Sequence, residues 1–146
     1  MLYFFDTNIV LHYLRESSIA QTIENQLHPF DGENVAVISV VTLGELYAIA
    51  YRNKWGEKRI KNLEKFILSF VIADINVEQI IQNYAYIDTY SQGKIDDEPT
   101  GVTARNMGKN DLWIVATSLY LNSTLLTTDN DFSHLNRKIS LRIFVS

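Results

Sequence analysis

Four acidic side chains stand where the chain is expected to leave a strand or to begin a helix. They are Asp6, Glu45, Asp111 and Asp129. Carboxylate oxygens are hard ligands, and the chain has no cysteine and no histidine pair at ligand spacing, so this set favours Mg²⁺ or Mn²⁺ over zinc. One or two such cations could polarise a phosphoryl oxygen and lower the pKa of an attacking water. The chemistry that suits these residues is hydrolysis of a phosphate ester by a metal-activated water.

Each acid taken alone has an explanation that needs no chemistry. Acidic side chains near a helix N-terminus are favoured by free N–H groups and by the helix dipole. Glu45 also stands three residues after Thr42, as the acid of a capping box does. Four clustered carboxylates repel one another, however, and such a cluster is tolerated chiefly when a cation neutralises it. The joint pattern therefore favours a metal site.

The acids can meet only if the elements that carry them are arranged in a parallel sheet. We expect strands near 2–5, 35–38, 71–73, 124–127 and 141–145, and helices over 9–14, 17–27, 42–51 and 60–70, from Asn76 (capped with Gln79) and from Lys109, with Ser39 or Thr42 as a cap. This alternation predicts a three-layer α/β/α sandwich with a central, mainly parallel sheet. Right-handed crossovers then bring the carboxyl ends of all strands to one edge, where ligands bind.

The composition fits one domain over residues 1–146, with 47% hydrophobic residues to fill a core. The apolar start lacks the basic residues and the length of a signal peptide, and no run approaches the roughly 20 apolar residues of a membrane helix. We therefore expect a cytoplasmic protein with no membrane partner. A net charge of −4 argues against general affinity for nucleic acid, but it allows an acidic pocket with a basic rim.

Basic side chains occur in two groups that could form such a rim. They are Arg52, Lys54, Lys58, Arg59, Lys61 and Lys65 in the first group, and Arg105 and Lys109 in the second. A solvated helix face explains any single lysine equally well. The three scattered histidines are interpreted as structural or surface residues, and Trp55 and Trp113 as packing or interface residues. Residues 91–107, with acids at 96–98, predict an exposed loop.

Four short strings resemble the ordered acidic motifs of PIN-domain ribonucleases, in particular the VapC-like toxins of type II toxin-antitoxin systems. They are FFDTN at 4–8, TLGEL at 42–46, GKNDLWIVATSL at 108–119 and LLTTDNDF at 125–132. The resemblance implies a PIN-like fold and an endoribonuclease. It also implies catalytic, metal-binding roles for Asp6, Glu45, Asp111 and Asp129, and polar support from Thr7, Asn8, Asn110 and Thr127.

The same resemblance implies Mg²⁺ or Mn²⁺, an RNA substrate, a homodimer and a small antitoxin as partner. Apolar residues of the helices at 17–27 and 56–70 could leave a groove for that partner. The chain departs from the family at Ala48–Ala50, where many relatives have a glycine, and at Val115, where an alanine is common. Asp131 lies near the last acid, but the Thr-x-Asp pattern selects Asp129. The acidic stretch at 96–98 puts any inherited substrate preference in doubt.

Three other classes of protein share part of this pattern. A haloacid-dehalogenase-like phosphatase shares an aspartate after the first strand, but its second aspartate is replaced here by Asn8, and no cap-sized insertion is evident. A response-regulator receiver lacks its expected Thr and Lys placements. A catalytically silent PIN-type module that binds RNA or protein stays open, although the presence of all four acids argues against it.

Overall fold

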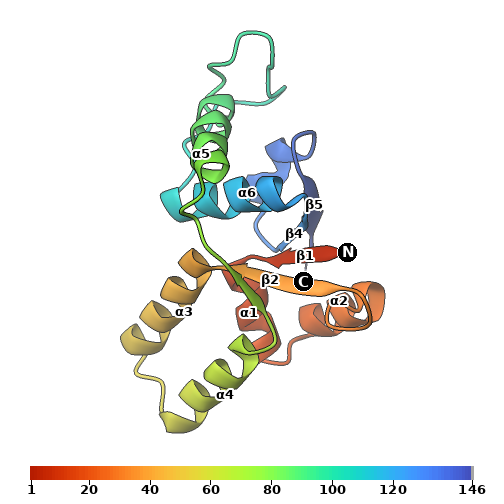
Figure 1. The fold of residues 1–146 in the computed structure, drawn as a ribbon, viewed down its shortest axis with the longest axis vertical. Coiled ribbons are helices and arrows are strands. Elements are labelled where there is room, and N and C mark those ends of the chain that lie inside the picture. The colour runs from red at the N-terminus through yellow and green to blue at the C-terminus, as the bar shows by residue number, and fades with distance from the viewer. Residues whose placement is uncertain (146) are drawn as a thin grey trace.

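The computed structural model describes residues 1–145, and five parallel strands form its centre (Figure 1). The strand order is β3-β2-β1-β4-β5. The strands are β1 (Leu2–Phe5), β2 (Val35–Ser39), β3 (Val71–Ala73), β4 (Thr124–Thr127) and β5 (Ser140–Ile143). In the middle strand, Phe4 pairs with Val37 of β2 and with Leu125 of β4. The predicted parallel sheet and all five strands are confirmed, although β5 begins and ends earlier than expected.

Helices cover both faces of this sheet, which confirms the three-layer architecture. They are α1 (Thr7–Leu14), α2 (Ser18–Leu27), α3 (Val40–Arg52), α4 (Glu57–Ile67), α5 (Glu78–Ser91) and α6 (Lys109–Leu121), with a short 3-10 helix η1 (Asn130–Leu135). Successive strand side chains point to opposite faces of the sheet, so there are two hydrophobic clusters. Phe5 packs with Ile9 and Leu63 on one face, whereas Phe4 packs with Ile114 on the other face. Figure 1 shows α1–α4 on one side of the sheet and α5 and α6 on the other.

Two capping boxes that the sequence suggested are wrong. The N-cap of α3 is Ser39, whose side chain accepts a hydrogen bond from Val41 N at 3.0 Å, so Thr42 lies inside the helix. Glu45 is therefore too far along α3 to close a capping box, and its position needs another explanation. Likewise, Val77 caps α5 without a side-chain hydrogen bond.

The loop between α5 and α6 begins at residue 92, close to the expected boundary, and it is fixed to the domain at two points. The carboxylate of Glu98 accepts a hydrogen bond from the Tyr86 hydroxyl and lies 3.3 Å from Lys138 Nζ. Farther along, Arg105 N donates to Ser91 O at 2.7 Å. These contacts set the course of the chain that leads into α6. No helix among residues 1–145 has both the length and the apolar character needed to cross a membrane.

Candidate active site

Asp6 lies at the junction of β1 and α1 and is 5% exposed. Its Oδ1 accepts a hydrogen bond from Thr7 N at 2.8 Å, and its Oδ2 accepts one from Thr127 Oγ1 at 2.7 Å. Burial raises the pKa of Asp6 above its ordinary value, the two hydrogen bonds oppose that rise, and the negative charges of Glu45 and Asp129 add to it. Asp6 is thus held in one orientation beside other acids.

Thr7 connects Asp6 with Glu45. Its backbone N–H bonds to Asp6, while its hydroxyl donates to Glu45 Oε1 at 2.7 Å. The Thr42 hydroxyl lies 3.3 Å from the Thr7 hydroxyl and is fully buried. Thr42, one of the two residues that could have capped α3, therefore supports Thr7, and Glu45 is oriented by a hydrogen bond from α1.

Thr127 connects Asp6 with Asp129 in the same way. Its hydroxyl donates to Asp6 and accepts from Asp129 N at 3.0 Å. Two buried threonines thus each contact a pair of acids from different elements. By contrast, Asn8 and Asn110 are exposed, and neither side chain takes part in a hydrogen bond among residues 1–145.

Asp111 lies in the first turn of α6, and the negative charge of every other acid of the set affects its pKa. Burial, and after it the negative charges of Asp6, Asp129 and Glu45 in that order, together raise the pKa of Asp111 to about 6. Acids that are as much as 123 positions apart in sequence therefore share one electrostatic environment at the carboxyl edge of the sheet. This is the proximity that the parallel fold was expected to create.

Asp131 is an acid of this region that sequence analysis set aside. Its negative charge also raises the pKa of Asp111, and its N–H donates to Asp129 Oδ1 at 2.8 Å. It lines the same cavity as Asp111, which has a volume of about 340 Å³. The Thr-x-Asp pattern selects Asp129, and the structure brings both aspartates together at the start of the short helix η1, which was not predicted.

The donor set suits a hard divalent cation, since it consists of carboxylate oxygens, and burial together with the neighbouring negative charges raises the pKa values of Asp6 and Asp111. The acids nevertheless stand apart: over residues 1–145, no three acidic or histidine side chains adopt a compact metal-holding arrangement. The residues fit the cation by their chemistry, and their oxygens would have to close around it.

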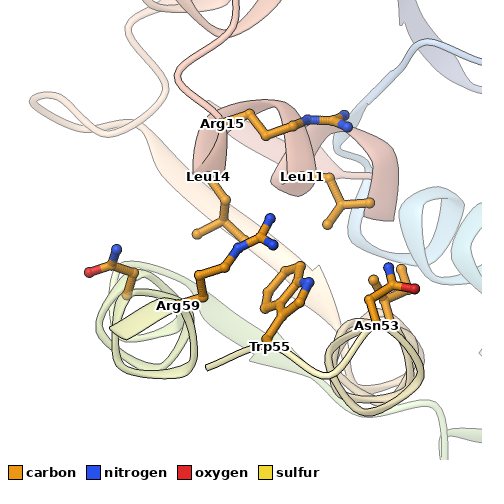
Figure 2. A pocket seen from close by; sticks show the side chains of 8 residues that line it. Leu11, Leu14, Arg15, Asn53, Trp55 and Arg59 are labelled. Atoms are coloured by element: carbon orange, nitrogen blue, oxygen red, sulfur yellow. The ribbon is translucent and has the colours of Figure 1, made fainter. Parts of the chain in front are cut away.

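The basic residues expected at the rim lie in two separate places. Arg105 lines the cavity beside Asp111, and the exposed Lys109 begins α6. Arg52, Lys54 and Lys58 are exposed around the turn from α3 to α4. Next to them is a different cavity of about 230 Å³, which Trp55 and Arg59 line (Figure 2). The two groups therefore border different cavities.

Solved structures of similar fold cover almost the whole chain. VapBC2 from Rickettsia felis, bound to a DNA fragment from its promoter, is similar with a TM-score of 0.77 and 23% identity, over 98% of each chain. VapBC-1 from nontypeable Haemophilus influenzae has a TM-score of 0.73 and 25% identity, over 98% of each chain. FitAcB from Neisseria gonorrhoeae has a TM-score of 0.69 and 19% identity, over 95% of each chain.

A comparison with curated proteins found no match. The PIN domain family, by contrast, matches residues 3–138, which include all four acids and both supporting threonines. This match extends over nearly the full chain and agrees with the motifs and with the fold. The chain belongs to the PIN domain family.

Proposed function

We propose that this protein is a divalent-metal-dependent endoribonuclease and the toxin of a toxin-antitoxin pair. The observation that carries the proposal is the grouping of acids at the carboxyl edge of the sheet, where Thr7 joins Asp6 to Glu45 and Thr127 joins Asp6 to Asp129. Such a concentration of negative charge is tolerated where a cation and a phosphodiester are to be bound. Membership of the PIN domain family supports a nuclease, and similar folds occur in structures named as VapBC and toxin-antitoxin complexes.

In this proposal Asp6, Glu45, Asp111 and Asp129 hold one or two Mg²⁺ or Mn²⁺ ions. A bound cation would supply charge neutralisation, polarisation of a phosphoryl oxygen and a water of lowered pKa. The protein contributes orientation, because Thr7 and Thr127 fix Asp6 through both of its oxygens and reach Glu45 and Asp129. No single acid is assigned as the general base.

The direct test is to incubate purified protein with total RNA in Mg²⁺, in Mn²⁺ or in chelator, and to sequence the new ends. The proposal expects cuts that need the cation and leave a 5′-phosphate and a 3′-hydroxyl. Cleavage that persists in chelator, or ends with a 2′,3′-cyclic phosphate, would contradict it. The RNA substrate leads us to place the activity in the cytoplasm.

A catalytically silent PIN module is the second candidate function, and the open arrangement of the acids favours it. Calorimetric titration with Mn²⁺ separates the two candidates. A silent module binds RNA or protein without taking up the cation at the acids. A nuclease binds the cation, and Asp6→Asn weakens that binding.

We further propose that the antitoxin docks on the cavity shown in Figure 2. Leu11 and Leu14 of α1 face Trp55 and Arg59 across it. The Arg59 guanidinium lies 4.6 Å from the centroid of the Trp55 ring, so an apolar floor stands beside a cation. These features suit a helix that presents an apolar and an acidic side chain together.

Apolar residues of the helices at 17–27 and 56–70 were expected to leave a groove for the partner. Ile19 and Ile23 of α2 are buried in the core, whereas Arg59 and Asn62 of α4 line the cavity. The cavity lies among α1, the end of α3 and the first part of α4. From there a basic side chain of the antitoxin could reach the acids, pair with them and exclude the cation.

Self-association is a separate proposal. Exposed apolar side chains lie along the edge strand and nearby helices, at Val71, Ile72, Ile81 and Tyr120, and they support a homodimer. Light scattering at micromolar concentration tests the homodimer, and a monomer would count against it.

Co-purification with the product of the adjacent reading frame tests the antitoxin. Harmless expression without any such neighbour would defeat the toxin assignment.

A further inference from the structure

The cavity beside Asp111 contains one well-anchored cationic side chain, that of Arg105. Arg105 Nη1 donates to Asp131 O at 2.9 Å and lies 3.9 Å from Asp131 Oδ1. The side chain is 34% exposed, and the backbone N–H is fixed by Ser91 O at 2.7 Å. A guanidinium has five N–H donors, and a single hydrogen bond from it occurs among residues 1–145. Arg105 is therefore held in place with most of its donors free.

We infer that this cavity is an RNA subsite, in which Arg105 binds the phosphate adjoining the scissile one. The inference rests on the proposed ribonuclease function. Arg105 and Asp111, a member of the acidic set, line the same cavity, so an RNA strand with one phosphate at the acids would place a neighbouring phosphate beside Arg105. A planar guanidinium binds a phosphate through two parallel hydrogen bonds. Because Arg105 is already ordered, little side-chain entropy is lost on binding.

A closed circuit of hydrogen bonds keeps Arg105 in this position. Asp131 O also lies 3.0 Å from His134 Nδ1, and since a carbonyl can only accept, Nδ1 carries the proton. Nε2 of the same ring lies 2.8 Å from the Ser91 hydroxyl, which can donate to it. Ser91 O in turn accepts from Arg105 N. Asp131, His134 and Ser91 are thus positioning residues for Arg105, and they join the loop before α6 to η1.

The buried Ser91–His134 pair takes no part in RNA cleavage. Ser91 is fully buried and His134 is 5% exposed, so neither can reach a substrate. Burial lowers the pKa of His134, and the nearby charge of Arg105 lowers it further, which keeps the ring neutral. A neutral ring with one donor and one acceptor nitrogen is what the circuit requires. The pair therefore serves geometry alone.

The two groups of basic residues bind different ligands. Arg105 stands at the acids and faces RNA, whereas Arg59 stands beside Trp55 and faces the partner protein proposed above. A matched control for charge is Arg137, which is exposed and lines a cavity with Ser118 and Asn122, at the C-terminal end of α6. The N-terminal end of that helix carries Asp111. Arg105→Gln and Arg137→Gln remove the same charge at opposite ends of α6.

The test uses full-length protein carrying Asp6→Asn, so that RNA is bound but not cut. The probe is a fluorescein-labelled, single-stranded RNA dodecamer of mixed sequence in Mg²⁺, followed by fluorescence anisotropy at several salt concentrations. Arg105→Gln is expected to weaken binding about tenfold, as the loss of a charge-assisted hydrogen bond does. It should also lower the salt slope by about one counterion. Arg137→Gln should leave affinity and slope at the parental values.

Arg105→Lys keeps the charge without the fork, so it should restore the salt slope while recovering affinity only in part. If Arg105→Gln lowers the melting temperature, the RNA affinity of Arg105→Lys shows whether Arg105 binds the phosphate. In protein with Asp6 intact, Arg105→Gln should raise KM more than it lowers kcat. Parental affinity in Arg105→Gln, with cleavage by the wild type intact, overturns the subsite and leaves the ribonuclease standing. Absence of both RNA binding and cleavage in the parental proteins overturns the two together.

Discussion

The Thr127 hydroxyl donates a hydrogen bond of 2.7 Å to Asp6 Oδ2, so the end of β4 orients a carboxylate at the end of β1, 121 positions earlier. The same hydroxyl accepts from Asp129 N. Thr7 forms the corresponding link from Asp6 to Glu45. Orientation of the acids therefore depends on two threonines, and both the charges and their supports can be tested separately.

Replacing Asp6 or Asp111 by asparagine should lower cation-dependent RNA cleavage by about 100-fold or more, because a neutral amide cannot replace an anionic ligand of a hard cation. The fold should survive, and without cation its melting temperature should stay equal or rise, because removing a charge relieves repulsion. RNA cleavage assays and thermal melting measure the two effects.

The control for these substitutions is Asp97→Asn, since Asp97 is exposed in the loop before α6. Its cleavage rate should stay close to that of the wild type. Cleavage by Asp6→Asn at the parental rate, with contaminating nuclease excluded, would remove the assigned site.

Thr127→Val keeps the shape of a fully buried side chain but removes its hydroxyl. Asp6 and Asp129 then each lose a hydrogen bond, and we expect a stability loss of about 1–2 kcal/mol. Cleavage should fall about tenfold, because the orientation of two acids is relaxed. Chemical denaturation and initial cleavage rates measure these effects. Thr127→Ser, which keeps the hydroxyl, should recover much of both, and failure to do so would show that the methyl group matters more.

The stability of the cation-free protein should depend on the ionisation of Asp111. Its pKa in the folded state is raised to about 6, so between its unfolded value and that pKa the folded protein binds more protons than the unfolded chain. The Asp111 contribution therefore favours folding at low pH and is lost as pH rises through about 6. Asp6 acts in the same direction, whereas His134, whose pKa is lowered, acts in the opposite one.

Thermal melting in chelator between about pH 5 and about pH 7.5 isolates this effect when wild type and Asp111→Asn are compared. The melting temperature of the variant relative to that of the wild type should increase as pH rises. Mn²⁺ should reduce that difference by stabilising the ionised carboxylate. A difference that does not vary with pH would mean that Asp111 is not buried among the other acids.

Trp55→Ala should weaken binding of the antitoxin about tenfold or more, because it removes the aromatic wall of the cavity and the ring beneath Arg59. Tyr51→Ala is the matched control, since Tyr51 is 76% exposed and does not line the cavity. Calorimetry with the co-expressed antitoxin measures both affinities. Equal losses in the two variants would place the antitoxin elsewhere on α3 or α4.

The sequence by itself determined the strands, their parallel pairing and the edge at which the acids gather, but not the order of the strands. Strand runs such as residues 2–5 and 124–127 are short, contain apolar or β-branched residues and are followed by polar residues, so their ends can be recognised locally. Parallel pairing with right-handed crossovers then places Asp6, Asp111 and Asp129 on one edge without knowledge of any contact. Only a few topologies are possible for such a sheet, and the pattern of apolar residues selects among these topologies.

Only the tertiary structure decided what each side chain touches. A capping box with Thr42 was one explanation for Glu45, but Glu45 accepts a hydrogen bond from Thr7 of another helix, and the Asp131 N–H donates to Asp129 at the start of η1. Arg105 and Arg59, which the sequence grouped as one rim, line different cavities. Such contacts join positions up to 121 residues apart and depend on helix packing and on side-chain rotamers. Local sequence does not encode these separately from the whole fold.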